Sequence, residues 1–331
     1  MPANAAVDAV RDFLAPDSLG GLRLGKPTSS GTLTLVPIFR DGPALDYDSF
    51  ADALKRRLIK VTEVRGHGDV SSLAVTNKSK AAVLMVEGEI LVGLKQNRVL
   101  NTTILVPPKT RLTIPVACVE ARRWRRSTSF ARKADYMLSS KIRGMQRQSV
   151  TYAARALGGF AADQQAVWQG VADDLQAHGV SSSTAAYSDI EKERGRQIED
   201  TLRRLQPTPG QAGVLALLGG AVWSLDVFDR PSTLLQMWQA LVGSYAADAL
   251  VPGKANPSVD LAMADLWIRN LGVGQATCHQ AVGRGETVLV SGTNGSVSAL
   301  VVDGVVVHLA ACPPDRDPLT LAHDEALGYA G

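Results

Sequence analysis

Residues 87–106, EGEILVGLKQNRVLNTTILV, place two carboxylates and a run of cationic and amide side chains between two apolar segments. The cationic and amide residues are Lys95, Gln96, Asn97, Arg98 and Asn101. Lysine and arginine recognise phosphate or carboxylate groups, and amides recognise hydroxyls or base edges. In one straight strand these side chains would alternate between two faces, so the segment predicts a binding site only if its backbone bends.

The two carboxylates, Glu87 and Glu89, fit two different structures. Carboxylate oxygens suit Mg²⁺, so a magnesium site is one interpretation. A Glu-Gly-Glu hairpin turn exposed to water is the other, and the sequence favours neither. Of the five histidines, none lies between residues 68 and 177, so the polar run has no imidazole ligand nearby in sequence.

A second polar group, CVEARRW, follows about twenty residues later. Here Glu120 is a candidate base, Arg123 a phosphate ligand, and Trp124 a stacking face for a base. The surrounding EARRWRRS holds four arginines. They suit a nucleotide or a nucleic-acid backbone, and equally an interface with acidic parts of the chain.

Most familiar catalytic patterns are absent from the sequence. It contains no Gly-x-Ser-x-Gly, no P-loop and no dinucleotide-binding glycine fingerprint. Cys118 lies within an apolar strand pattern, which favours a buried thiol over a reactive one, although Arg122 and Arg123 keep the second interpretation open. His308 lies on an apolar strand and is expected to be a core histidine.

The basic residues are concentrated in one part of the chain. Residues 122–155 carry ten basic side chains and one acidic one, a net charge of +9, which leaves −6 for the remainder of a chain whose total is +3. A local positive field of this kind is typical of nucleic-acid binding, but dedicated nucleic-acid domains are usually basic throughout.

The pattern of apolar residues predicts which elements carry these groups. Six β-branched or alternating segments predict strands at 32–39, 58–64, 72–77, 82–93, 98–107 and 111–120, with a helix at 48–57 between them. Residues 129–206 have helical periodicity. After QPTPGQAG, two strands surround Gly219-Gly220, Pro231 begins a helix, and a further helix near 258–271 precedes three strands.

We therefore expect an α+β protein with a β-rich, sandwich or barrel-like N-terminal lobe, a helical middle segment and a smaller mixed α/β C-terminal lobe. The predicted segments are an N-terminal helix and linker at 1–31, the β-rich lobe with the polar motif at 32–128, the helical segment at 129–206, the C-terminal lobe at 207–312 and an acidic tail at 313–331.

Composition narrows the class of protein. Hydrophobic content of 45% and charged content of 20% are those of a soluble globular protein. No apolar run reaches the roughly 18 residues that span a bilayer, and the N-terminus lacks the basic start of a signal peptide. Three widely spaced cysteines give no disulfide framework, so we expect no membrane association and a cytoplasmic location.

The two polar groups also resemble a known family. VEGEILVGLKQNRVLNTTILVP followed by IPVACVEARRW is similar to the signature of the ADP-ribosylglycohydrolase- and rhodanese-phosphatase-associated protein family, of the first type. The resemblance covers about 33–310 and implies a role near ADP-ribose or NAD metabolism, with no reaction specified. The motif would have a smaller residue where this chain has Leu94.

Three functional hypotheses follow. The first is binding or processing of a phosphorylated nucleoside, ADP-ribose or an NAD derivative, with Glu89 or Glu120 as the catalytic carboxylate and Mg²⁺ as a compatible cofactor. The second is nucleic-acid binding through 122–155. The third is a non-catalytic interaction module or homodimer, in which the polar residues tie strands together.

One geometric prediction connects the two polar groups. If TTILVP (102–107) and RLTIPV (111–116) pair as a hairpin, residues 98–101 meet residues 118–124. Arg98 and Asn101 would then share a face with Glu120 and Arg123, and Glu120 would pair with an arginine.

Overall fold

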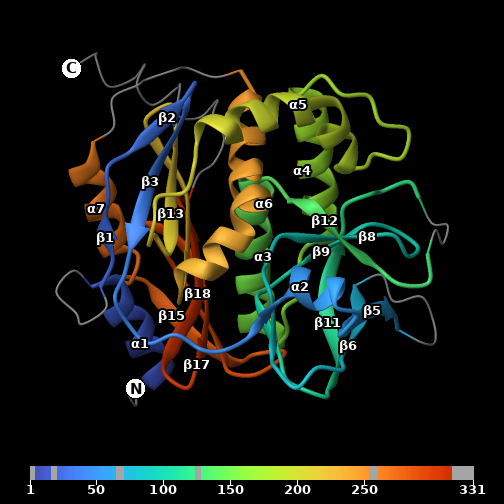
Figure 1. Cartoon of the computed structure of the whole chain (residues 1–331), viewed down its shortest axis with the longest axis horizontal. Helices are drawn as coiled ribbons and strands as arrows, with labels where there is room; N and C mark the ends of the chain where they lie inside the picture. The colour runs from blue at the N-terminus through green and yellow to red at the C-terminus, as the bar shows by residue number, and fades with distance from the viewer. Residues whose placement is uncertain (1–3, 16–20, 65–70, 124–127, 253–259, 315–331) are drawn as a thin grey trace.

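Two β-rich lobes flank two long helices, α3 (Ser140–Leu157) and α6 (Pro231–Leu250), as Figure 1 shows. This computed structural model describes residues 4–15, 21–64, 71–123, 128–252 and 260–314. The predicted α+β class is confirmed.

The larger lobe is built on a nine-stranded sheet that joins the first strands of the chain to the last. Its order is β1-β3-β13-β14-β18-β17-β16-β15, with β2 also paired to β3, and every neighbouring pair is antiparallel. The strands are β1 (Arg23–Leu24), β2 (Thr28–Ser30), β3 (Leu33–Phe39), β13 (Gly213–Leu218), β14 (Ala221–Phe228), β15 (Gln275–Gln280), β16 (Glu286–Gly292), β17 (Gly295–Val302) and β18 (Val305–Cys312). Thus β3, at the start of the segment 32–128, lies in the same sheet as the C-terminal strands.

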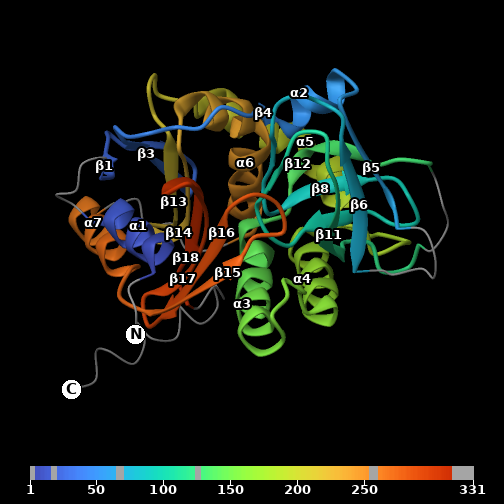
Figure 2. The same ribbon diagram turned by 90° about the horizontal axis from the view of Figure 1, so that it is seen from below.

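Helices cover both faces of this sheet. Helix α1 (Ala5–Leu14) begins where the Asn4 side chain accepts hydrogen bonds from the amides of Ala6 and Val7, and it packs on the outer face beside α7 (Leu261–Asn270). Helix α6 covers the inner face. Figure 2 shows α1 and α7 on the side of the sheet away from α6.

The second lobe is an open, partly rolled sheet with the order β12-β8-β9-β11-β6-β5, next to a small sheet β10-β7-β4. Its elements are β4 (Asp48–Ser49), α2 (Phe50–Lys55), β5 (Ile59–Glu63), β6 (Ser72–Asn77), β7 (Val83–Met85), β8 (Glu89–Val92), β9 (Arg98–Leu100), β10 (Ile104–Val106), β11 (Arg111–Cys118) and β12 (Arg132–Met137). Two expected strands, 82–93 and 98–107, are therefore each divided into two short strands.

The middle segment, 129–206, consists of one strand, β12, followed by helices. After β12 come α3, α4 (Gln164–Ala177) and α5 (Ser188–Arg204). Strand β12 pairs with β8, and its register shifts between Lys133 and Met137. The sequence did not show this strand because the irregular register removes the strict alternation that identifies a half-buried strand.

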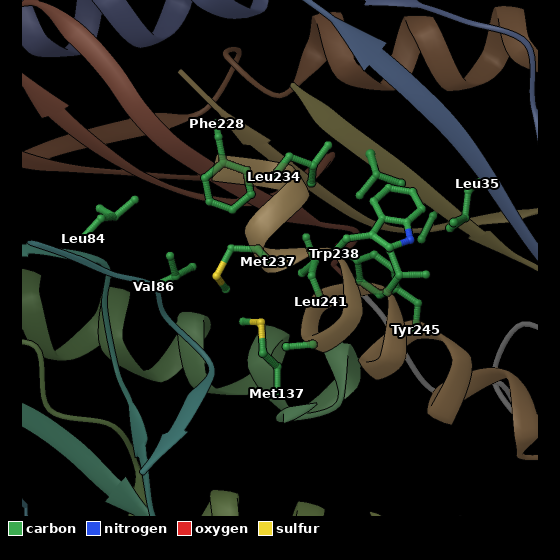
Figure 3. Packing of buried hydrophobic residues seen from close by; sticks show 14 of the residues in the cluster. Leu35, Leu84, Val86, Met137, Phe228, Leu234, Met237, Trp238, Leu241 and Tyr245 are labelled. Atoms are coloured by element: carbon green, nitrogen blue, oxygen red, sulfur yellow. The ribbon is translucent and has the colours of Figure 1, made fainter. Parts of the chain in front are cut away.

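One apolar core connects the two lobes through α6. Figure 3 shows Met237 of α6 between Phe228 of the large sheet and Val86 and Met137 of the second lobe, with Trp238 on the side of Leu35 and Tyr245. Burying each large apolar side chain contributes about 1.5–3 kcal/mol. The lobes are therefore held together by a continuous core.

Candidate functional site

The motif bends, as a compact site requires. Gly93 and Leu94 both have positive φ, +109° and +57°, and turn the chain between β8 and β9. The positive φ of Leu94 explains why a smaller residue is expected at this position, because the left-handed region of backbone conformations favours glycine. Its side chain is nevertheless buried in the core of the second lobe, and this packing offsets the backbone cost.

Glu120 is the centre of the hydrogen-bond network that follows the bend. The guanidinium of Arg123 donates to Glu120 Oε2 from Nη2 at 2.7 Å and from Nε at 2.8 Å. Arg123 Nη2 also donates to Asn97 Oδ1 at 3.1 Å, and the backbone amide of Asn97 donates to Glu120 Oε2 at 3.3 Å. The predicted pairing of Glu120 with an arginine is confirmed.

The predicted hairpin does not form. Strand β10 pairs with β7, and β11 pairs with β9 and β6 instead. The second pairing still brings the two polar groups together, because Cys118 lies opposite Arg98. The predicted proximity of 98–101 to the second group is right, but its cause is a different strand pairing.

Asn101 does not share a site with Glu120. Its side chain donates to the carbonyl of Phe160 at 3.0 Å and accepts from Gln146 of α3 at 2.7 Å. Asn101 thus fixes α3 and the loop after it against the second lobe, so the expectation of a common site for all the motif residues is wrong.

The Arg98 side chain lies inside the protein and makes one hydrogen bond to the described part of the chain. It is 1% exposed, and its Nη1 donates to Gln96 Oε1 at 3.2 Å. Gln96 in turn donates to the Glu120 carbonyl at 2.9 Å. Among the described residues, Arg98 Nε and Nη2 have no hydrogen-bond partner. Lys95 is only half-buried, and its amide donates to Glu63 Oε1.

The Glu-Gly-Glu turn is buried rather than exposed, which corrects one of the two interpretations. Glu87 accepts from Arg147 at 2.5 Å, and Glu89 lies 3.4 Å from the Lys133 ammonium. Burial raises the pKa of Glu89, and the Lys133 charge opposes that shift. At Gly88, a Cβ would lie 2.2 Å from Arg143 Cδ, so α3 approaches the turn too closely for a side chain.

A second buried ion pair joins α3 to the large sheet. Arg143 Nη1 lies 3.1 Å from Asp226 Oδ1, and Asp226 also accepts from the Tyr245 hydroxyl. His308 stacks on Phe228 at 4.6 Å between ring centroids and contacts Thr103 through Nδ1 at 2.8 Å. His308 is the expected core histidine. The sequence did not identify Arg143 and Arg147, although they belong to the basic stretch 122–155.

Asn97, Glu120 and Arg123 line one wall of a cleft of about 1070 Å³ between β12, α5 and α6, which we call the motif cleft. Lys192 and Arg203 of α5 also line it, and each pairs with an aspartate of the same helix, Asp189 and Asp200. Its charged lining residues are Arg123, Arg132, Lys133, Lys192 and Arg203 on the positive side, and Glu120, Asp135, Glu191 and Glu199 on the negative side. Of the expected ligand-binding residues, Lys95, Gln96, Arg98 and Asn101 do not line this cleft, and Trp124 lies outside the described residues. The expected catalytic Glu89 is also buried away from it.

Glu191 is the unusual carboxyl of the motif cleft. It is half-buried, its Oε1 has no hydrogen-bond partner among the described residues, and burial raises its pKa to about 7. Burial, with the nearby Glu191 carboxylate, also raises the pKa of Tyr136, which lines the same cleft. Ser188 and Glu191 have the spacing of a capping box, in which Ser188 would cap the helix. Instead, Tyr187 occupies the N-cap of α5 without a side-chain cap bond.

Cys118 is a buried thiol, as predicted. It is 0% exposed, and burial raises its pKa. In the described residues no group of three or more His, Cys, Asp or Glu side chains has the arrangement of a metal site. None of the described helices is long and apolar enough to cross a membrane.

Comparison with known proteins gives one match. No curated protein and no solved structure matches the chain significantly. A family model described as the ARG and Rhodanese-Phosphatase-superfamily-associated Protein domain matches residues 21–312. This range runs from the start of the large sheet to the end of β18, and it includes the motif cleft. The chain therefore belongs to the ARG and Rhodanese-Phosphatase-superfamily-associated Protein domain family.

Proposed function

We propose that the motif cleft binds a phosphorylated nucleoside, and that ADP-ribose or an NAD derivative is its ligand. The observation that carries the proposal is the convergence of Asn97, Glu120 and Arg123 on one wall of a cleft large enough for such a molecule. The association recorded in the family's description is the reason to test ADP-ribose and NAD first. Membership of the family's first type and a cytoplasmic location are part of the same proposal.

Each part of the ligand has a matching group. Arg123, Lys192 and Arg203 supply cations for phosphates from two sides of the cleft. Tyr136 supplies an aromatic face for the base. Glu120, already held by Arg123, accepts hydrogen bonds from ribose hydroxyls.

Any hydrolytic step in this cleft would use two carboxyl groups in different roles, Glu120 and Glu191. Glu120 is fixed by Arg123 and suits a charged acceptor, whereas Glu191 has a pKa of about 7 and can hold or take up a proton near neutral pH. A general acid or base works best when its pKa lies near the working pH, a condition that Glu191 meets. Carboxylate oxygens here would also accept Mg²⁺.

Isothermal titration calorimetry with ADP-ribose, NAD and ADP, each with and without Mg²⁺, tests the proposal. Lys192→Ala and Arg203→Ala should each weaken binding about tenfold, because each removes one phosphate-facing cation worth about 1.4 kcal/mol. Arg269→Ala, an exposed arginine of α7 paired with Asp265, is the matched control and should leave binding unchanged. Absence of heat with all three ligands would refute the proposal.

A specific observation favours one other function, a non-catalytic interaction module. Gln96, Arg98 and Asn101 are all engaged in buried hydrogen bonds that fix strands and helices. Under this alternative the protein binds none of the nucleotides and forms a homodimer or a complex, which light scattering across a concentration series would detect.

Part of the stretch 122–155 is already engaged within the protein, so fewer of its basic side chains can contact nucleic acid. Arg143 and Arg147 are buried in ion pairs, and Arg123 is held by Glu120. These pairs agree with the interpretation of part of the basic stretch as an internal interface.

A further inference from the structure

A second cleft, of about 730 Å³, is lined by residues of α2, β5, β12 and α6. We call it the basic cleft. Six cationic residues line it: Lys55, Arg57, Lys60, Lys78, Arg132 and Lys133. Asp135 is the acidic residue among its described lining residues. Whereas the motif cleft has a nearly balanced lining, this one is strongly positive.

Five of the six cations of the basic cleft lack anionic partners in the described structure. Lys133 lies 3.4 Å from Glu89. The other five form no ion pair with any carboxylate of the described residues. Some other cations of the described residues do form ion pairs, including the neighbouring Arg56 with Asp48 at 3.1 Å. A concentration of unpaired like charges costs folding free energy, and an anionic ligand would remove that cost.

Arg57 occupies a backbone position that suits glycine. It follows α2 with φ of +57°, and the amide of Leu58 donates to the Ala53 carbonyl at 2.8 Å. This is the usual left-handed end of a helix, where glycine carries no penalty and arginine does. A charged residue that lines a cleft from a strained backbone position is better explained by binding than by stability.

Phe130 places an aromatic surface at the edge of the same cations. Its side chain is 51% exposed, and the Lys60 ammonium lies 5.7 Å from the centroid of its ring. The next residue is fixed, because the Ala131 amide donates to the Val61 carbonyl at 3.0 Å. The ring is therefore held at the cleft while its surface is left open.

We propose that the basic cleft binds single-stranded nucleic acid, with its cations on the backbone phosphates and Phe130 stacked on a base. Single strands are bound by this combination of a positive groove and an open aromatic ring, because phosphates need the charge and every base has a flat face. An acidic peptide would use the cations but not the ring, and free phosphate would use neither the ring nor the length of the cleft. The basic cleft adjoins the motif cleft at β12, because Arg132, Lys133 and Asp135 line both, whereas Lys55, Arg57, Lys60, Lys78 and Phe130 line the basic cleft and not the motif cleft.

The test is fluorescence anisotropy of a labelled octathymidylate titrated with the full chain between 50 and 200 mM salt. Single strands give a slope of log K against log salt of about −0.7 for each phosphate contact, so five unpaired cations predict a slope of about −2 to −3.5. Lys192→Ala, which changes the lining of the motif cleft but not of the basic cleft, should leave oligonucleotide binding unchanged, and this separates the two sites.

Three variants assign the contacts. Lys60→Ala should make the slope less steep by about 0.7. Phe130→Ala should weaken binding about tenfold at an unchanged slope, since it removes stacking and no charge. Arg57→Gly should raise the Tm by roughly 2 °C while weakening binding and reducing the slope, so lost binding could not be ascribed to unfolding. Lys26→Ala, an exposed lysine of the other lobe, is the control.

The pattern of competition decides the class of ligand. Displacement of the oligonucleotide by tripolyphosphate at equal phosphate concentration, with no effect of Phe130→Ala, would overturn the proposal in favour of a phosphate site. Tighter binding of polyglutamate than of the oligonucleotide would overturn it in favour of an acidic protein partner. No anisotropy change at 50 mM salt would overturn it outright.

Discussion

The Arg143 guanidinium donates from Nη1 to both carboxylate oxygens of Asp226, at 3.1 and 3.4 Å, with side chains 2% and 0% exposed. The pair joins α3 to β14 and so connects the middle segment to the large sheet. Burial alone would raise the pKa of Asp226, but the Arg143 charge and the hydrogen bonds to the carboxylate outweigh it and hold that pKa below its ordinary value.

Breaking this pair from one side should be costly. Asp226→Leu should lower the free energy of unfolding by about 3–5 kcal/mol, because it leaves a buried guanidinium without its anion. Adding Arg143→Met should restore a large part of the loss, and urea unfolding of both variants would measure it. The exposed pair of Arg269 and Asp265 is the control, and Asp265→Ala should cost at most about 1 kcal/mol. Equal losses in the single and double variants would contradict the argument.

Two glycines with positive φ allow the steric cost of an added Cβ to be measured apart from the cost of the backbone conformation. Gly88→Ala should destabilise the protein by more than about 2 kcal/mol, because its φ is +86° and the added Cβ would lie 2.2 Å from Arg143 Cδ. Gly31→Ala has φ of +62° and no atom within 4 Å of the added Cβ, so it should cost only about 1 kcal/mol. Thermal or urea unfolding gives both values, and equal losses would mean that the contact with α3 is unimportant.

Glu191 should make stability fall as pH rises. Its folded pKa of about 7 exceeds the ordinary carboxyl value, so the unfolded chain loses its proton first. The contribution of Glu191 is therefore fully present below about pH 4 and is lost as pH rises through about 7. Between these two pH values the wild type should lose on the order of 1–2 kcal/mol of unfolding free energy through Glu191, allowing for its partial exposure. The Glu191→Gln variant should not show this loss.

The comparison must be made against the wild type at each pH. Asp174 also has a pKa raised by burial, to about 7, and its contribution remains in the variant. Urea midpoints at pH 5 and 8 provide the measurement. A wild type and a Glu191→Gln variant with the same difference between these midpoints would show that Glu191 is ordinary.

Gln96 should act on stability and not on ligand binding. It connects Arg98 Nη1 to the Glu120 carbonyl, and it does not line the motif cleft. Gln96→Ala should therefore cost about 2–4 kcal/mol of stability, because Arg98 loses its hydrogen bond while remaining buried. Calorimetry with ADP-ribose, below the unfolding transition, should give the affinity of the wild type. Unchanged stability with lost affinity would instead place Gln96 in a binding site.

The sequence predicted elements better than their pairing. The strands at 33–39, 213–218 and 221–228 and the helix from Pro231 are where periodicity and turn residues placed them. That the first of these pairs with the second could not be seen, because pairing between distant strands depends on tertiary packing and leaves no local pattern.

The site was predicted in part, for a related reason. Glu120 and Arg123 are three residues apart, so their pairing follows from local spacing. By contrast, Glu191 and Lys192 reach the motif cleft only because α5 packs beside α6 and β12. Nothing in a charged amphipathic helix shows which of its polar residues will be covered.

The pairing of β3 with β13 has a consequence for synthesis of the chain. At about 5–20 residues per second, the roughly 170 residues between Phe39 and Gly213 take about 10–35 s to leave the ribosome. Throughout that interval β3, LTLVPIF, can pair with β1 and β2 on one edge only. Its other edge presents unpaired backbone N–H and C=O groups beside apolar side chains, the condition under which strands of different chains associate. A chaperone that covers β3 during this interval should therefore raise the yield of folded protein from a cell.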